Sequence, residues 1–182
     1  MIARYVAKFI FWLIGWKFDP RIPTEKKYII IIAPHTSNWD FLIGKLTNWI
    51  CGVSPKVLVK KEAFTFLTGP FIRMWGGIPI DRNNTVNIVD QVVQYFNDNE
   101  EFILGITPEG TRKRNPNWKT GFYRIAVKAK VPIFYGYIDF KTKTAGMHDH
   151  FDPTGDMEAD MKKIKAYFKD MEGYHKEDFA IE

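Results

Sequence analysis

The chain contains a single cysteine, Cys51, so an internal disulfide framework is excluded. A lone cysteine fits a small core residue in a protein of a reducing compartment. The chain also lacks internal repeats, low-complexity segments and any Pro/Gly-rich linker that would divide it. Its 182 residues therefore predict one globular domain with a sizeable hydrophobic core.

Several functional signatures are missing as well. The sequence has no G-x-S-x-G element of a serine hydrolase, no P-loop, no dinucleotide fingerprint and no RNA-binding signature. The net charge is +5, which suits anionic lipid, an acidic carrier protein or nucleic acid. Because the cations form no dense stripe, nucleic acid is not expected as a partner.

Aromatic residues, in contrast, are plentiful. They make up 16% of the sequence, within a globular composition of 46% hydrophobic and 26% charged residues. This excess suits an apolar pocket or a membrane-facing surface, and an aromatic-rich core has the same composition. Composition alone leaves both interpretations open.

The N-terminal residues 2–16 predict an amphipathic helix. Its apolar stripe consists of Ile2, Tyr5, Val6, Phe9, Trp12, Leu13 and Trp16. The apolar run is far shorter than the roughly 20 residues that span a bilayer, and no small-residue cleavage site follows it. Tryptophans and lysines around an apolar face are typical of a helix at a membrane surface. A helix that packs on the domain is the alternative.

Apolar runs that alternate with helical patterns predict the rest of the fold. The strands are expected at 28–33, 56–60, 77–80, 102–106 and, as one or two strands, 131–140. The helices are expected at 38–50, 62–75 with a break near Gly69–Pro70, 84–97, 118–130 and 156–171, the last being charged and exposed. This order predicts an α/β domain with a mostly parallel or mixed central sheet flanked by helices. Ligands of such sheets bind in the loops that follow the strands.

The loop after the first strand holds His35 and, five residues later, Asp40. A histidine titrates near neutral pH and acts as a general base when a carboxylate orients its ring. No protein nucleophile accompanies the pair, so a substrate hydroxyl would take that part. Alternatively, Asp40 caps the helix that follows, because residues 37–40 match the [ST]-x-x-[DE] pattern, and His35 is an ordinary loop residue.

Two later loops carry cations. Residues 76–82 join two glycines to Arg82, which suits an anion or, alternatively, a surface Asp–Arg pair. Residues 107–114 join a flexible glycine and a threonine to three cations that include Arg112. Such a loop suits a phosphate, and a cationic turn without function fits equally well.

Four short blocks occur along the chain in this order: HTSNWD (35–40), GGIPIDR (76–82), PEGTR (108–112) and VPI (131–133). In order and approximate spacing, they resemble the motifs of the glycerophospholipid acyltransferases, which include the lysophosphatidic acid acyltransferases. The resemblance covers residues 28–135. Pro79 and Lys113 depart from the usual pattern, in which an aromatic residue and a serine are common, and they leave the acceptor's identity open.

The resemblance implies transfer of a fatty acyl group from acyl-CoA or acyl-carrier protein to the hydroxyl of a lysophospholipid. Lysophosphatidic acid is the first candidate. Another lyso-lipid, such as an amino-acid-based one, and a non-catalytic lipid-binding protein of this fold are the alternatives. His35 would be the base and Asp40 its orienting acid. The residues implied for binding the substrate phosphate are Lys60, Arg82, Glu109, Gly110, Thr111 and Arg112.

The same resemblance implies access to a membrane. We expect residues 1–20 to form a membrane-interfacial segment and residues 21–182 the acyltransferase catalytic domain, with residues 64–75 as a second contact. The expected location is peripheral, on the cytoplasmic face of a membrane. No cofactor or metal is implied, and we expect His148 and His150 to be solvated rather than to bind a metal.

Overall fold

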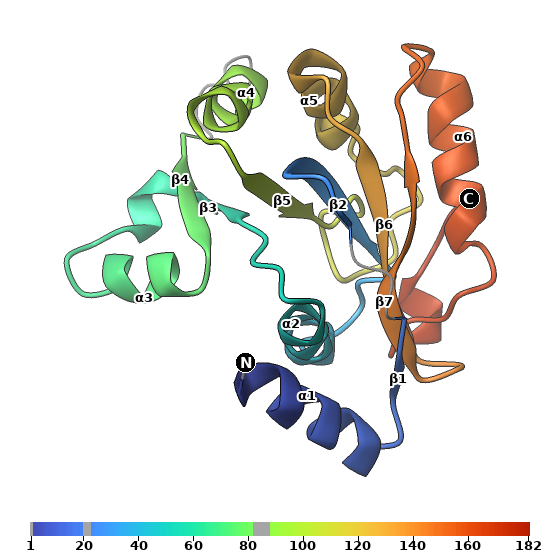
Figure 1. Ribbon diagram of the computed structural model, residues 1–182. Helices are drawn as coiled ribbons and strands as arrows, with labels where there is room; N and C mark the ends of the chain where they lie inside the picture. The colour runs from blue at the N-terminus through green and yellow to red at the C-terminus, as the bar shows by residue number, and fades with distance from the viewer. Residues whose placement is uncertain (1, 20–22, 82–87) are drawn as a thin grey trace.

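The computed structural model describes residues 2–19, 23–81 and 88–182 (Figure 1). In this part of the chain, a five-stranded sheet has the strand order β1-β7-β6-β2-β5. Its strands are β1 (Lys17–Phe18), β2 (Lys27–Ala33), β5 (Phe102–Ile106), β6 (Ile133–Asp139) and β7 (Thr144–Phe151). All neighbours are parallel except β6 and β7, which are antiparallel. The predicted fold class, an α/β domain with a mostly parallel or mixed central sheet, is confirmed.

The helices cover both faces of the sheet. They are α1 (Ile2–Leu13), α2 (Trp39–Cys51), α4 (Ile88–Asp98), α5 (Gly121–Ala129) and α6 (Met157–Phe168). In β2, Ile29 and Ile31 belong to the core cluster under α4, α5 and α6, whereas Ile32 packs against the cluster that includes α1 and α2. Because both faces of this central strand are buried, its sequence is an unbroken apolar run rather than an alternation.

A small lobe projects from the open edge of the sheet, at the left of Figure 1. We call residues 57–80 the α3 lobe. Its parallel strands β3 (Val57–Lys60) and β4 (Gly77–Ile80) enclose a 3-10 turn (Lys61–Ala63) and helix α3 (Gly69–Met74). The lobe joins β5 through Lys56, whose N–H donates to the Ile103 carbonyl over 2.7 Å.

Some of the predicted elements are wrong in extent. The region 62–75 is not one broken helix, because hydroxyl–backbone hydrogen bonds between Thr65 and Thr68 form a turn that competes with the helix before Gly69. The helix predicted at 118–130 starts only at Gly121. Trp118 lies before it, where its indole N–H donates to the Ala180 carbonyl over 3.1 Å.

Other differences lie elsewhere along the chain. The region 131–140, predicted as one or two strands, holds the single strand β6 (Ile133–Asp139), and its partner β7 was not predicted because Gly146 and polar residues interrupt its apolar pattern. The charged helix α6 is not wholly exposed, since Ile164 and Phe168 are fully buried on its inner face. Helix α1 ends at Leu13 rather than at residue 16. The first turn of the helix predicted at 84–97 lies outside the described residues.

Candidate active site

The turn between β2 and α2, which we call the His35 turn (residues 34–38), lies at the carboxyl end of the central strand. The Nδ1 atom of His35 is 3.1 Å from the Oδ2 atom of Asp40, which lies in the first turn of α2. The side chain of His35 is 18% exposed and that of Asp40 only 2%. The sequence spacing therefore brings the imidazole and the carboxylate together, with the acid on the buried side.

Asp40 also fixes the backbone of the turn. Its Oδ2 atom accepts hydrogen bonds from the backbone N–H groups of Thr36 (2.7 Å) and Ser37 (2.8 Å). The residue at the N-cap of α2 is Asn38, and its side chain makes no capping hydrogen bond. Asp40 is therefore more than a helix cap, because the oxygen that holds the turn also faces the histidine ring.

This contact sets the tautomer of His35. A carboxylate oxygen only accepts hydrogen bonds, so Nδ1 carries the proton that points at Asp40. In the neutral ring, Nε2 is then the unprotonated nitrogen. The arrangement is that of a general base whose proton-accepting atom is defined by its neighbour.

Glu109 locks the loop that follows β5 onto this turn. Its Oε1 atom accepts a hydrogen bond from the backbone N–H of His35 over 2.9 Å, and its own carbonyl accepts one from Asn115 over 2.8 Å. The residue is 1% exposed. Burial is the main reason that the pKa of the Glu109 carboxyl is raised to about 8; the hydrogen bond from the His35 N–H acts to lower this pKa, and the nearby Asp40 acts to raise it. Glu109 therefore holds the backbone of the His35 turn through its hydrogen bond to the His35 N–H. This contact agrees better with a role in shaping the loop than with binding a phosphate.

The other phosphate-binding candidates fall in different places. Arg112 lines a pocket beside the His35 turn, and Thr111 accepts a hydrogen bond from the Lys113 backbone N–H. Gly110 adopts a left-handed φ of 68°, as the sharp turn of this loop requires. Lys60 is exposed at the end of β3. Arg82 lies outside the described residues.

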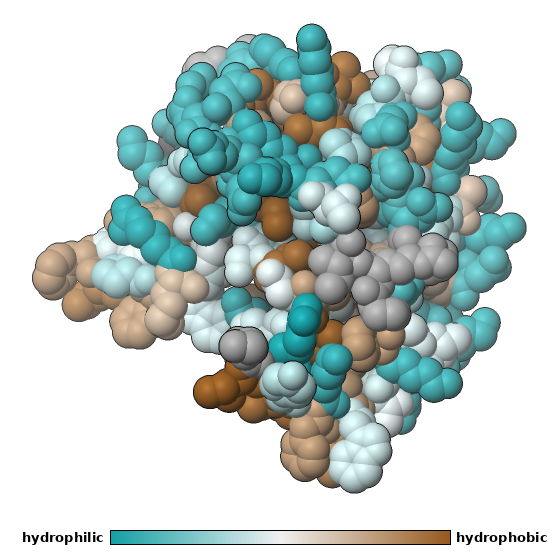
Figure 2. Space-filling model, in the orientation of Figure 1, coloured by the Kyte–Doolittle hydropathy of each residue, from teal (hydrophilic) through white to brown (hydrophobic). Residues whose placement is uncertain are grey.

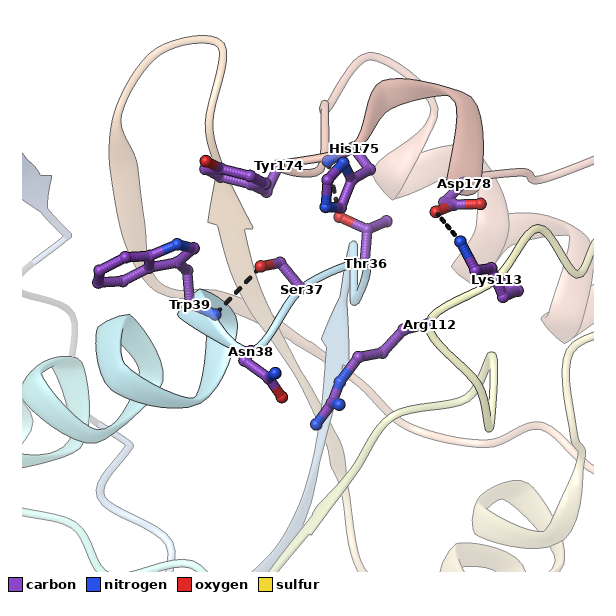
Figure 3. Close-up of a pocket in the computed structure, with 9 residues that line it drawn as sticks. All are labelled: Thr36, Ser37, Asn38, Trp39, Arg112, Lys113, Tyr174, His175 and Asp178. Carbon is purple, nitrogen blue, oxygen red and sulfur yellow. Dashed lines mark hydrogen bonds and ion pairs between the residues drawn. The ribbon is translucent and has the colours of Figure 1, made fainter.

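The pocket has a volume of about 380 Å³ and three walls (Figure 3). The first wall is the stretch 36–39, at the start of α2, and the second is Arg112 with Lys113. The third consists of Tyr174, His175 and Asp178, which follow α6. Sequence reasoning missed this third wall, because these residues lie beyond the four motifs. The available signal was His175 itself, one of only four histidines in the chain.

Apolar side chains gather on two exposed surfaces. The outer face of α1 exposes Ile2, Tyr5, Val6, Phe9, Trp12 and Leu13. The outer side of the α3 lobe exposes Phe66, Leu67, Phe71, Met74 and Trp75. Figure 2 shows apolar residues at the left edge, over the lobe, and at the lower edge, over α1. In the described residues, no helix combines the length and the apolar character that crossing a membrane requires.

The inner face of α1, in contrast, packs on the domain. Ala7 and Phe11 are buried in a cluster with Ile43 and Leu46 of α2. Arg4 ties the two helices together, since its Nε atom donates to the Ile50 carbonyl over 2.7 Å. Both interpretations of the N-terminal helix thus have a structural counterpart, because one face packs on the domain and the apolar stripe from Ile2 to Leu13 stays uncovered by the described chain. Trp16, predicted as the last residue of that stripe, lies beyond the helix and packs against Phe140 instead.

Three comparisons place this chain among known proteins. A family model described as Acyltransferase matches residues 18–135, which are 118 of the 182 residues. A 1-acyl-sn-glycerol-3-phosphate acyltransferase of Streptococcus pneumoniae (strain ATCC BAA-255 / R6) is 31% identical over 118 residues, which cover 62% of this chain and 42% of that protein. The chain thus matches less than half of the length of this curated relative.

The fold has a solved counterpart as well. The crystal structure of the 1-acyl-sn-glycerophosphate (LPA) acyltransferase PlsC from Thermotoga maritima superposes with a TM-score of 0.59 and 19% sequence identity. The match covers 89% of this chain and 73% of that one. Because the family model matches 118 of the 182 residues, this chain belongs to the acyltransferase family.

Proposed function

We propose that this protein transfers a fatty acyl group from a thioester to the free hydroxyl of a lysophospholipid. Lysophosphatidic acid is the first candidate acceptor, and phosphatidic acid would be the product. The observation that carries the proposal is the contact between His35 Nδ1 and the buried Asp40 carboxylate at 3.1 Å. It leaves Nε2 free to accept a proton beside a pocket that Arg112 lines.

The reaction needs no nucleophile from the protein. His35 removes the proton of the acceptor hydroxyl while the oxygen attacks the thioester carbonyl carbon. The Asp40 carboxylate stabilises the imidazolium that forms. When the tetrahedral intermediate collapses, the carbon–sulfur bond breaks, and the thiolate takes the proton back from His35. An ester and a free thiol result, and the enzyme returns to its starting state.

Arg112 is the group best placed for an acceptor phosphate. Its guanidinium has no hydrogen-bond or ion-pair partner within the described ranges, and in Figure 3 it extends toward the start of α2. A planar guanidinium binds phosphate oxygens in pairs. Arg82 and Lys60 remain candidates through the family resemblance. The net charge of +5 suits either thioester donor, acyl-CoA or acyl-carrier protein, since both are anionic.

Attachment to a membrane surface would bring the enzyme to its lipid acceptor. The outer faces of α1 and of the α3 lobe expose large side chains such as Trp12 (74%) and Phe66 (95%). Exposed aromatic patches of this kind favour insertion into the headgroup region of a bilayer, and the positive charge favours anionic lipid. We therefore propose a peripheral enzyme of the cytoplasmic membrane face, with residues 1–20 as the interfacial segment before the catalytic domain 21–182.

The test is an acyl-transfer assay with the full chain, radiolabelled palmitoyl-CoA and lysophosphatidic acid in mixed micelles. We expect labelled phosphatidic acid, and a loss of at least about 10³-fold in kcat for His35→Ala. His150→Ala is the matched control, because His150 is exposed on β7 and should keep wild-type turnover.

The alternatives give different results in the same assay. A panel of other lyso-lipids, including amino-acid-based ones, would reveal a different acceptor if phosphatidic acid does not form. If the thioester stays intact with every acceptor while lipid still binds, the protein is a lipid-binding member of the family. Full turnover by His35→Ala, with an unchanged circular dichroism spectrum, would contradict the assignment of the base.

A further inference from the structure

The C-terminal segment (residues 172–182) crosses the carboxyl end of the sheet and is anchored at both sides. At the β6 side, the Glu172 N–H donates to the Asp139 carboxylate over 3.0 Å, and the Glu172 carbonyl accepts from the Phe140 N–H over 2.9 Å. At the other side, the Ala180 carbonyl accepts from the Trp118 indole over 3.1 Å. The residues between these anchors are therefore held in place over the His35 turn.

In the middle of its course, this segment touches the turn directly. The His175 N–H donates to the Thr36 hydroxyl over 3.1 Å. A Cβ atom added to Gly173 would lie 2.5 Å from that hydroxyl oxygen and 2.6 Å from the Thr36 methyl group. Thr36 is 3% exposed and cannot easily move away. Glycine therefore allows the segment to lie against the residue next to His35.

The pocket beside this contact collects polar groups from all three walls (Figure 3). Arg112 is unpaired within the described ranges. The His175 ring has one ionic neighbour, Glu177, at 3.9 Å, and its side chain remains 48% exposed. Asp178 would disfavour an anion, but Lys113 neutralises it across 3.3 Å. The remaining positive charge of Arg112 and the donors around it suit one anionic group.

We propose that His175 is a binding residue for the acceptor, and that it contacts the anionic headgroup opposite Arg112. This inference rests on the proposed acyl transfer and extends the site to the C-terminal segment, beyond the family match to residues 18–135. A phosphate oxygen accepts a hydrogen bond from an imidazole N–H as it does from a guanidinium. The Lys113–Asp178 pair holds the segment to the loop that carries Arg112, and His175 and Arg112 line the pocket from different walls.

Steady-state kinetics with lysophosphatidic acid and palmitoyl-CoA test this role. For His175→Ala, we expect the acceptor KM to rise about tenfold, because one hydrogen bond to a charged group is lost. The KM for palmitoyl-CoA should stay unchanged, and His175→Gln should recover part of the acceptor affinity through its amide N–H. His150→Ala is the matched control, with a side chain 46% exposed on β7.

A binding experiment on the full chain gives a readout that does not depend on turnover. The chain has four histidines, so their ring proton resonances can be assigned by substitution and followed by nuclear magnetic resonance. We expect sn-glycerol 3-phosphate to shift the His175 resonance in the wild type and in His35→Ala, whereas glycerol does not. Inorganic sulfate as a second titrant tells a fitted headgroup from a general anion effect.

The outcomes separate this inference from the proposed function. An unchanged acceptor KM in His175→Ala, together with an immobile His175 resonance, would overturn the inference even if phosphatidic acid forms. If wild-type protein makes no phosphatidic acid but sn-glycerol 3-phosphate shifts the His175 resonance, the binding role of His175 is supported and the proposed acyl transfer is contradicted. An equal rise of both KM values in His175→Ala, without a resonance shift, would show a purely structural role.

Discussion

The His35 turn and the outer face of α1 differ in how their side chains are partnered within the chain. In the turn, the single oxygen Asp40 Oδ2 faces the His35 ring and accepts two backbone N–H groups, and Glu109 holds the His35 N–H from behind. On α1, large apolar side chains such as Phe9 (59%) and Trp12 (74%) are exposed, with no cover from the described chain. The contacts that hold the first region come from the chain itself, whereas the second region presents an apolar surface whose exposure costs free energy in water.

This difference separates the candidate catalytic site from the surface that would contact a partner. Buried polar groups are expensive unless they are hydrogen-bonded, and the contacts of Asp40 Oδ2 and Glu109 in the His35 turn all come from this chain, so the protein maintains this geometry by itself. An uncovered apolar surface indicates a binding partner outside the molecule, such as a membrane or another protein, that removes the surface from water. The proposed acyl transfer between amphipathic molecules would use both, the fixed base inside and the apolar contact at the surface.

The largest effect should come from removing the negative charge of Asp40. In Asp40→Asn, the amide oxygen can still accept from the Thr36 and Ser37 N–H groups and from His35 Nδ1, because all three contacts use one oxygen, Oδ2. The neutral amide no longer stabilises the imidazolium that forms when His35 takes the proton. We expect kcat for acyl transfer to fall by roughly 10²–10⁴-fold.

The measurement is kcat at saturating acceptor and thioester, with the melting temperature as the control for folding. A variant that turns over within about threefold of the wild type would show that the negative charge of Asp40 does not contribute to turnover. The NH2 group of the variant takes the place of Asp40 Oδ1, which is buried and has no partner in the described part of the chain, so the melting temperature also reports the cost of this unpaired amide.

The sequence predicts the His35 turn well because its determinants are local. His35 and Asp40 are five residues apart, and an apolar strand and a helix at fixed positions bring them together. The strands at 28–33 and 102–106 are recognisable for the same reason, since their β-branched and apolar runs need no distant partner to explain them.

The parts that escape prediction depend on distant contacts. His175 meets Thr36 across 139 positions of sequence, and no local pattern announces it. Strand β7 is recognisable through its pairing with β6 and β1, and Trp118 leaves the expected helix because its indole N–H donates to the Ala180 carbonyl. Tertiary interactions override local propensity at each of these places.

A smaller effect should come from the group that supports the turn. The pKa of Glu109 is about 8 in the folded protein and about 4.5 in the unfolded chain, so folding favours the protonated form. Glu109 therefore lowers the free energy of unfolding. This lowering is absent below pH 4.5 and grows as the pH rises to 8. In Glu109→Gln this lowering disappears, while the amide oxygen still accepts the His35 N–H.

We expect the free energy of unfolding of Glu109→Gln to exceed that of the wild type increasingly between pH 5 and pH 8, by a total of roughly 3 kcal/mol. Urea unfolding at four pH values measures this, with Glu101→Gln as the control, because Glu101 is 69% exposed in a surface pair with Lys26. Parallel curves for Glu109→Gln and wild type would mean that Glu109 is already ionised at neutral pH. Turnover should change little, because the backbone contact remains.

The smallest effect should come from the apolar surface, where several side chains share the contact. We expect Phe9→Ser with Trp12→Ser to reduce partitioning onto anionic vesicles about tenfold, because less apolar area leaves the water on binding. Stability in solution should stay nearly unchanged, since both side chains are exposed. Val127→Ser on α5 is the control, because Val127 is also exposed (44%) but lies on a helix at the other face of the sheet.

Vesicle sedimentation at low and high salt separates the two forces. Attraction of the basic protein to anionic lipid weakens as salt rises, whereas the apolar contribution does not. The serine variants should therefore lose the binding that remains at high salt, and Phe66→Ser with Leu67→Ser should do the same if α1 and the α3 lobe enter one bilayer surface together. If only the α1 variant loses vesicle binding, helix α1 is the sole membrane anchor among the surfaces tested. If all variants bind vesicles equally, neither surface binds the membrane, and the exposed face of α1 would then be expected to bind a protein partner.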